Sequence, residues 1–174
     1  GTLSDDDIEI NVEKGVVYVS ISDKLLFNSG SFTVTTRAKK VLEKIAKVIS
    51  DKPDLEFMVE GHTDNMLIDQ EKAAETIPGV LDNWDLSVKR ATSVVRILQN
   101  DYGVDPTKLV AAGRSFYMPI ADNDSSVSRA VNRRTRIIVL PKLDQFTKLI
   151  EEGMSMNVPA TGPSNTISSD NKPV

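Results

Sequence analysis

The stretch from Asn83 to Ala91, read together with residues 61–65, constrains the fold more than any other part of the chain. It leads into a segment with the spacing of a helix that has one buried face, because apolar residues recur at Ala91, Val94, Val95 and Leu98. We predict a helix from about Ser87 to Tyr102, with Ser87 as its N-cap. Arg90 lies along the edge of the apolar face. A guanidinium there needs a carboxylate from the protein or from a ligand.

Asp64 occupies a comparable position at the end of a strand. Residues 55–60 alternate between apolar and polar side chains, as a β-strand does, and Asp64 follows them. In an α/β arrangement, strand ends and helix starts meet at one edge of the sheet, where ligands bind. Asp64 and Arg90 could therefore hold a ligand that carries both charges. The alternative is a structural ion pair between the two residues, and their spacing alone does not decide between these interpretations.

The remaining periodic segments predict an α+β domain. Alternating side chains predict strands, the first two joined as a hairpin, at residues 8–12, 16–21, 109–113 and 134–140. Helical spacing predicts two further helices, at residues 35–50 and 126–132. We expect a two-layer sandwich in which helices pack on one face of a mixed, four- to five-stranded sheet.

The connection at residues 66–82 has no sustained period and contains Pro78 and Gly79. So long a connection inside a compact domain is usually functional, and we interpret it as a long loop or insertion. The chain is thus expected to comprise a flexible lead-in at residues 1–7, one main domain at 8–141, a C-terminal helix at 142–153 and an extended or disordered tail at 154–174.

Composition excludes several classes of function. A net charge of -4 argues against nonspecific binding of nucleic acid, which needs a basic surface. No apolar run approaches the roughly 20 residues that cross a bilayer, so membrane attachment is expected only through a part preceding residue 1. With no cysteine and a single histidine, His62, the chain offers too few ligands for a zinc site. No nucleophile lies at a recognisable distance from a base, so we expect no enzyme activity and no cofactor.

Four motifs, in this order, resemble those of the OmpA-like peptidoglycan-binding domain, which outer-membrane OmpA-type proteins, the lipoprotein Pal and the flagellar stator protein MotB share. The motifs are Phe27-Asn28-Ser29-Gly30-Ser31, Val59-Glu60-Gly61-His62-Thr63-Asp64, Asn83-x-x-Leu86-Ser87-x-x-Arg90-Ala91, and Gly113 and Pro119 followed by Asn132-Arg133-Arg134. The resemblance implies noncovalent binding of the diaminopimelate-containing stem peptide of the cell wall.

The resemblance also implies which residues bind. Asp64 and Arg90 would grip the two ends of diaminopimelate, and both should be hydrated in the free protein. Further pocket residues fall on Asn28, Ser29, Gly30, Ser31, Thr63, Asn65, Asn83, Leu86 and Arg133. The expected function is anchoring of an envelope protein or the outer membrane to the cell wall, in the periplasm. The alternative is an interaction or dimerisation module of a MotB-like motor stator, acting as a homodimer.

Overall fold

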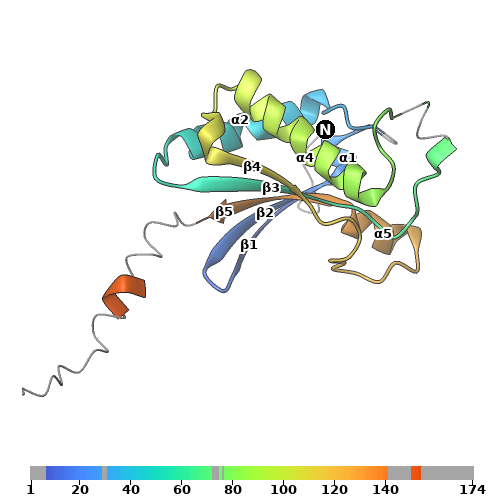
Figure 1. Cartoon of the computed structure of the whole chain (residues 1–174). Coiled ribbons are helices and arrows are strands. Elements are labelled where there is room, and N and C mark those ends of the chain that lie inside the picture. Colours follow the sequence, from blue (N-terminus) through green and yellow to red (C-terminus); the bar gives the residue numbers. More distant parts are fainter. Residues whose placement is uncertain (1–6, 29–30, 72–74, 76, 141–149, 154–174) are drawn as a thin grey trace, which may run out of the picture. The chain divides into compact units, whose positions relative to one another are not determined.

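The computed structural model describes residues 7–28, 31–71, 75, 77–140 and 150–153. Its centre is a five-stranded sheet with the strand order β1-β2-β5-β3-β4 (Figure 1). The strands are β1 (Ile8–Glu13), β2 (Val16–Ser22), β3 (Glu56–His62), β4 (Leu109–Gly113) and β5 (Arg134–Leu140). Every strand predicted from the alternation is present.

The sheet is mixed, as predicted. β5 pairs antiparallel with both β2 and β3, whereas β3 and β4 run parallel. Parallel neighbours need a long crossover connection, and the chain supplies it with helix α4 (Asn83–Asn100) between β3 and β4. This crossover places the start of α4 near the carboxyl end of β3, where the functional residues are expected.

The β1–β2 hairpin closes through a two-residue turn. Lys14 and Gly15 both have positive φ angles, of 50° and 78°, between the paired residues Glu13 and Val16. Two successive residues with positive φ match the right-handed twist of the strands, and this fixes the hairpin register.

Two long helices form the second layer. α2 (Thr36–Ser50) and α4 lie on the same side of the sheet (Figure 1), as the amphipathic spacing predicts. Thr35 caps α2, because its hydroxyl oxygen accepts from the backbone N–H of Ala38 at 3.1 Å. That hydroxyl also donates to the carbonyl of Leu25 at 2.7 Å, which ties α2 to the segment after β2.

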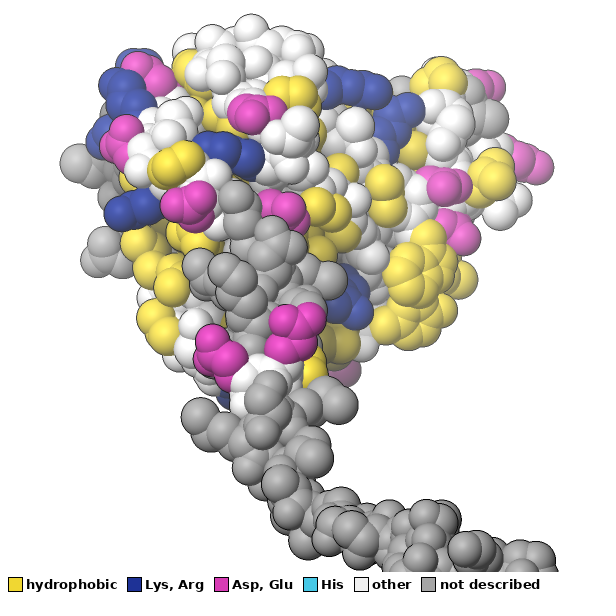
Figure 2. Space-filling view, turned by 60° about the vertical axis from the view of Figure 1, so that its left-hand side comes forward, with side chains coloured by type: hydrophobic (Ala, Val, Ile, Leu, Met, Phe, Trp, Pro, Cys, Tyr) yellow, Lys and Arg dark blue, Asp and Glu magenta, His cyan; other side chains and the backbone are white. Residues whose placement is uncertain are grey.

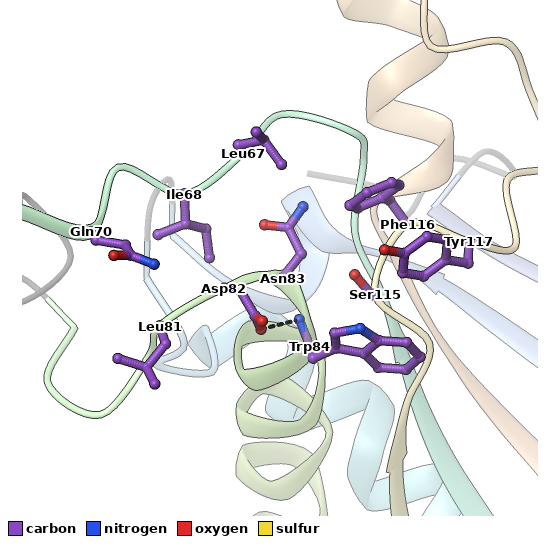
Figure 3. Close-up of a pocket in the computed structure, with 10 residues that line it drawn as sticks. All are labelled: Leu67, Ile68, Gln70, Leu81, Asp82, Asn83, Trp84, Ser115, Phe116 and Tyr117. Carbon is purple, nitrogen blue, oxygen red and sulfur yellow. Dashed lines mark hydrogen bonds between the residues drawn. The ribbon is translucent and has the colours of Figure 1, made fainter.

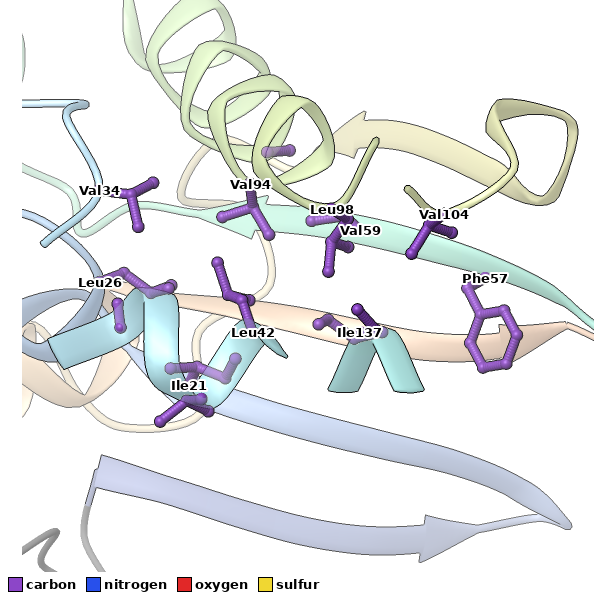
Figure 4. Packing of buried hydrophobic residues seen from close by; sticks show 14 of the residues in the cluster. Ile21, Leu26, Val34, Leu42, Phe57, Val59, Val94, Leu98, Val104 and Ile137 are labelled. Carbon is purple, nitrogen blue, oxygen red and sulfur yellow. The ribbon is translucent and has the colours of Figure 1, made fainter. Parts of the chain in front are cut away.

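The hydrophobic core lies between this helical layer and the sheet (Figure 4). Leu42 of α2 and Leu98 of α4 are fully buried against Ile21, Val59 and Ile137 of the central strands. Outside the core, Figure 2 shows acidic and basic side chains interspersed over the face it draws, without one large basic area.

Two shorter α-helices and one 3-10 helix, η2 (Pro106–Lys108), are also described. α5 (Ser126–Asn132) occupies the predicted position, whereas α1 (Asp23–Leu26) was not anticipated from the sequence. The chain divides into two compact units, residues 1–142 and 143–174. Of the second unit only residues 150–153 are described, and they are helical. The lead-in at 1–6, most of the expected helix at 142–153 and the tail at 154–174 lie outside the described residues.

Candidate functional site

α4 begins at Asn83, four residues before the predicted start at Ser87. Asp82 is the N-cap, because its carboxylate accepts hydrogen bonds from the backbone N–H groups of Trp84 at 2.8 Å and Asp85 at 3.1 Å. This cap extends the helix toward its N-terminus, so the prediction that Ser87 caps it is wrong. The Ser87 hydroxyl is buried and donates instead to the carbonyl of Trp84 at 2.8 Å.

Two paired glycines let α4 approach the sheet closely. Gly61 of β3 pairs with Gly113 of β4. A Cβ atom at Gly61 would lie 2.1 Å from the backbone oxygen of Ser87, and one at Gly113 would lie 2.3 Å from the Ser87 Oγ. Neither strand position has room for a side chain, because atoms do not approach this closely. The first turns of α4 are thus held against the carboxyl ends of both strands.

The buried face of α4 changes character along its length. Asn83, Ser87 and Arg90 are buried in the first two turns, and apolar side chains follow in the last turns, at Ala91, Val94 and Leu98. The apolar half packs in the core, while the polar half meets the end of β3. Buried polar groups need partners, and those of Arg90 define the site.

Arg90 forms an ion pair with Asp23 of α1. Its Nη1 lies 2.8 Å from the Asp23 Oδ2, and the two side chains are only 8% and 9% exposed. The guanidinium also lies over the ring of Phe27, 5.5 Å from the ring centre. Burial raises the pKa of the Asp23 carboxyl, although the charge of Arg90 opposes this rise.

This ion pair leaves hydrogen-bonding capacity unused. Among the described residues, Arg90 Nε and Asp23 Oδ1 are buried and have no hydrogen-bond partner. An unpaired buried polar group costs free energy and calls for an explanation, such as a ligand or an ordered water. The ion pair with Asp23 is made through Nη1, so the Nε edge of the guanidinium remains available to a second carboxylate.

Asp23 is a site residue that the sequence interpretation missed. Its backbone N–H donates to the carbonyl of Arg133 at 3.0 Å, and its own carbonyl accepts from the N–H of Phe27 at 2.8 Å. The first bond holds α1 beside the junction of α5 and β5, and the second closes the C-terminal end of α1. The available signal was an acidic residue two positions before the apolar run Leu25-Leu26-Phe27.

Asp64 pairs with Arg133 rather than with Arg90. The Arg133 Nη1 lies 2.5 Å from the Asp64 Oδ2, with side chains that are 35% and 10% exposed respectively. The other Asp64 oxygen accepts from the backbone N–H of Met66 at 3.1 Å. The two predicted gripping residues therefore have separate partners, and the structure describes no ion pair between them. The expectation that both are hydrated is wrong, because Asp64 and Arg90 are each only 7% exposed.

Asn83 joins the start of α4 to the loop that follows Asp64. Its side-chain amide donates to the carbonyls of Asp64 at 3.0 Å and Met66 at 3.1 Å. Thr63, also buried, donates its backbone N–H to the carbonyl of Ser115 at 2.9 Å. These bonds place the end of β3, the start of α4 and the loop after β4 at one location.

Of the remaining predicted pocket residues, some lie around this location and two are outside the described part of the chain. Asn65 and Asn28 are exposed, whereas Leu86 and Ser31 are half-buried. Next to Ser31, the ring of Phe32 lies beneath the Lys89 ammonium at 4.7 Å, so this loop reaches α4 near Arg90. Ser29 and Gly30 lie outside the described residues.

A second buried polar cluster lies on the opposite face of β3. The Nε2 of His62 is 2.8 Å from the Oε1 of Glu60, and the Nε of Arg114 is 2.9 Å from the other Glu60 oxygen. Burial alone would raise the pKa of Glu60, but the hydrogen bonds from His62 and Arg114 outweigh it and lower the pKa to about 2. Burial lowers the pKa of His62, with the Glu60 hydrogen bond opposing that change. His62 is thus a packed histidine at the strand end, as predicted.

Within the described part of the chain, no three histidine, cysteine or acidic side chains gather closely enough to hold a metal ion. The helices described there are also too short or too polar to cross a membrane.

Comparison with known proteins identifies the family. The sequence model of the OmpA family matches residues 26–133, which include the loop at 28–31, Asp64, Arg90 and Arg133. The chain belongs to the OmpA family. The resemblance of its four motifs is therefore confirmed. The matched region contains Asp64, Arg90, Arg133 and the glycines that contact α4. Asp23, the partner of Arg90, lies just before it.

The similar proteins are envelope and motility proteins. The chain is 27% identical over 135 residues to motility protein B of Bacillus subtilis and 31% identical over 137 residues to outer membrane protein Omp38 of Acinetobacter baumannii. These matches cover 78% and 79% of the chain, but only 49% and 35% of the two relatives. The chain thus spans about half or less of the curated relatives it matches.

Solved structures confirm the fold. The cell wall anchor of the T6SS from Pseudomonas aeruginosa is 30% identical, with a TM-score of 0.66 and coverage of 78% of this chain and 89% of that one. The periplasmic domain of Helicobacter pylori MotB (residues 90–256) has a TM-score of 0.72 over 87% of this chain and 90% of that one. At 24% identity, this second likeness concerns the fold alone.

Proposed function

We propose that this domain binds peptidoglycan noncovalently, by holding the free end of a diaminopimelate residue in the stem peptide. The observation that carries the proposal is the unused Nε donor of Arg90, which is buried beside the start of α4. A ligand carboxylate on this edge of the guanidinium would satisfy the donor without displacing Asp23.

The acidic partner for the ligand is Asp64. Its ion pair with Arg133 is partly exposed, so a ligand ammonium could approach the carboxylate from the solvent side. The free end of diaminopimelate carries an ammonium and a carboxylate on one carbon. These two groups would match the carboxylate of Asp64 and the guanidinium of Arg90, which lie on adjoining elements. Thr63, Asn83, Leu86 and the loop at residues 28–31 would form the walls, with Asn65 at the rim.

Such binding would anchor an envelope protein, or the outer membrane, to the cell wall from the periplasm. The names of the relatives support this location, since they include outer membrane proteins and a cell wall anchor. The proposed interaction breaks no covalent bond and requires no cofactor. Any membrane attachment would be supplied by another part of the protein.

A second candidate is an interaction or dimerisation module of a motor stator. Motility protein B from two genera is among the similar sequences, and periplasmic domains of MotB are among the similar structures. In this case a homodimer would present the fold to other stator components. A protein that is a homodimer in solution but does not co-sediment with insoluble peptidoglycan would favour this candidate.

Isothermal titration with two synthetic tripeptides tests the proposal. One is L-Ala–γ-D-Glu–meso-diaminopimelate, and the other carries lysine in the third position and so lacks the distal carboxylate. We expect the protein to prefer the first tripeptide, and Asp64→Ala to weaken its binding by about 2–5 kcal/mol. Arg90→Lys retains the positive charge but loses the planar guanidinium. The ratio of the affinities for the diaminopimelate and lysine tripeptides should therefore fall at least about tenfold.

The matched control is Arg96→Lys, on the exposed face of the same helix. It should bind both tripeptides as the wild type does. Folded Asp64→Ala and Arg90→Lys proteins with unchanged affinities would refute the assignment of these two residues.

A further inference from the structure

Three aromatic side chains lie together beside the candidate site and have no role in it so far. Trp84 is 47% exposed and Tyr117 61% exposed, and their ring centres are 5.4 Å apart. Phe116 stacks on Tyr117 with 4.5 Å between ring centres. Large aromatic rings exposed as a group are unusual on a protein surface and often mark a binding site. We refer to Trp84, Phe116 and Tyr117 as the aromatic cluster.

The aromatic cluster forms one wall of a pocket of about 270 Å³ (Figure 3). Leu67, Ile68 and Leu81 of the connection before α4 line it on the other side, and Asn83 stands between the two walls (Figure 3). The volume lies just below the roughly 300–1,000 Å³ of ordinary small-molecule pockets, so it suits a single ring rather than a long chain.

The pocket offers almost no charge. Asp82 is the one charged residue among those that line it, and its carboxylate is occupied in capping α4. The remaining polar groups are the Gln70 and Asn83 amides and Ser115, and the Asn83 Oδ1 is a buried acceptor without a partner among the described residues. This lining favours a neutral ligand with an apolar face and hydroxyl or amide groups at its edge.

The backbone holds the aromatic cluster in place. Ser115 has a positive φ of 52°, a conformation that costs energy in a residue other than glycine. Two hydrogen bonds fix it: its carbonyl accepts from the N–H of Thr63 at 2.9 Å, and its own N–H donates to the Ser87 hydroxyl at 3.2 Å. The turn that follows carries Tyr117 beside Trp84 and Phe116 against Tyr117. Strain that the surroundings maintain in this way is typical of binding sites.

The pocket is continuous with the candidate site. Asn83 lines it and also binds the carbonyl of Asp64, while Ser115 lines it and also binds Thr63. In peptidoglycan, two amino acids and a lactyl group separate diaminopimelate from the glycan strand. Three extended α-linked units would span about 10–11 Å, and the γ-linked glutamate reaches somewhat further because it adds two backbone atoms. A stem peptide in the site therefore has a sugar within reach of the adjoining pocket.

We propose that the aromatic cluster is a subsite for one amino-sugar ring of the glycan strand, which stacks its C–H face on Trp84 and Tyr117. The acetamido or hydroxyl groups of the sugar bind the Asn83 and Gln70 amides. This inference rests on the proposed function, because the stem peptide determines where the sugar lies. With this subsite, the domain would bind stem peptide that is attached to the glycan strand more tightly than free stem peptide.

Titration with two probes tests the subsite: the diaminopimelate tripeptide, and the same tripeptide linked to the N-acetylglucosamine–N-acetylmuramic acid disaccharide. We expect the wild type to bind the disaccharide probe about tenfold more tightly, the size of a good aromatic contact. In Trp84→Ala and Tyr117→Ala the affinity ratio should fall to near one. Tyr18→Ala is the control, because Tyr18 packs on Arg136 of β5 outside the pocket, and it should retain the ratio.

The subsite would be overturned if the wild type bound the two probes with equal affinity, or if both pocket variants kept the wild-type ratio of the two affinities. Either result would leave the proposed function intact. Failure of both probes to bind the wild type would overturn the proposed function together with the subsite. Trp84 is the single tryptophan of the chain, so its fluorescence gives an independent measurement that needs no variant. The disaccharide probe should change its emission and the free tripeptide should not, and equal responses to both would also contradict the subsite.

Discussion

Arg90 donates to Asp23 across 2.8 Å in a position where neither side chain is more than a tenth exposed. The candidate site therefore contains an arginine that is already paired before any ligand arrives. Asp64, the other gripping residue, pairs with an arginine that remains about one-third exposed. The two halves of the site thus differ in burial, and substitutions in them should differ in their effect on folding.

We predict that Arg90→Ala destabilises the domain by about 3–5 kcal/mol, because it leaves the Asp23 carboxylate buried without a partner. Asp64→Ala should cost only about 1–2 kcal/mol, since water can reach Arg133. Urea unfolding of both variants measures the difference. The double variant Asp23→Asn/Arg90→Gln removes both charges and should recover part of the loss. Equal destabilisation by Arg90→Ala and Asp64→Ala would contradict the distinction.

We predict that Gly61→Ala destabilises the domain by about 1–3 kcal/mol or more, because its Cβ would meet the Ser87 carbonyl oxygen at 2.1 Å. Backbone atoms cannot rotate away as a side chain does, so the start of α4 must shift. Thermal unfolding measures the cost. Gly153→Ala is the control, because among the described residues no atom outside its own helix lies within 4 Å of the new Cβ. A Gly61→Ala protein as stable as wild type would show that α4 does not touch β3 there.

Acid should destabilise the domain in two steps. The folded-state pKa of His62 is below its usual 6.5, so the stability it contributes is lost as the pH falls below about 6.5, when the unfolded chain takes up the proton first. Glu60 has a folded-state pKa of about 2 against a usual 4.5. Its contribution, on the order of 3 kcal/mol, is lost as the pH falls from about 4.5 toward 2.

Denaturant unfolding at pH 7, 5 and 3 measures this dependence. His62→Gln should flatten the change between pH 7 and 5, and Glu60→Gln the change between pH 5 and 3. Stability that is constant from pH 7 to 3 in the wild type would show that the buried pair does not behave as its geometry implies.

Replacing residues 68–80 by a short linker should preserve the fold, because the sheet and both long helices lie outside this segment. The replacement retains Met66, which binds Asn83, and removes Pro78, whose carbonyl accepts from Lys89 at 2.7 Å. We expect a modest loss of stability and a loss of the pocket wall at Ile68. Circular dichroism and thermal unfolding check the fold. An unfolded product would show that residues 66–82 are part of the domain core rather than an insertion.

The periodic parts of the sequence predicted the fold well. The alternation in residues 8–12 and 16–21, and the helical spacing in 35–50, are strong because each segment has one apolar face, and the structure confirms all three. The start of α4 was misplaced because its first turn is polar on the buried side. A periodicity argument follows apolar residues, and Asn83 and Ser87 are buried without being apolar.

The partners within the site could not be predicted in the same way. Asp64 and Arg90 follow from their positions at element ends, but the sequence offers no measure of the distance from Arg90 to Asp23, 67 positions earlier. The pairing depends on how α1 packs against α4, and α1 is too short to show a period. The aromatic cluster also depends on a tertiary turn, because Ser115 adopts a positive φ just before Tyr117 reaches Trp84.

The charges of the candidate site cancel. Asp23 and Asp64 supply two negative charges, and Arg90 and Arg133 supply two positive ones. A group without net charge produces a weak field beyond the Debye length of about 8 Å at physiological ionic strength, and the free end of diaminopimelate is itself a zwitterion. Encounter with the cell wall would therefore depend little on electrostatic attraction, and the affinity should stay nearly constant as the salt concentration around the cell rises or falls.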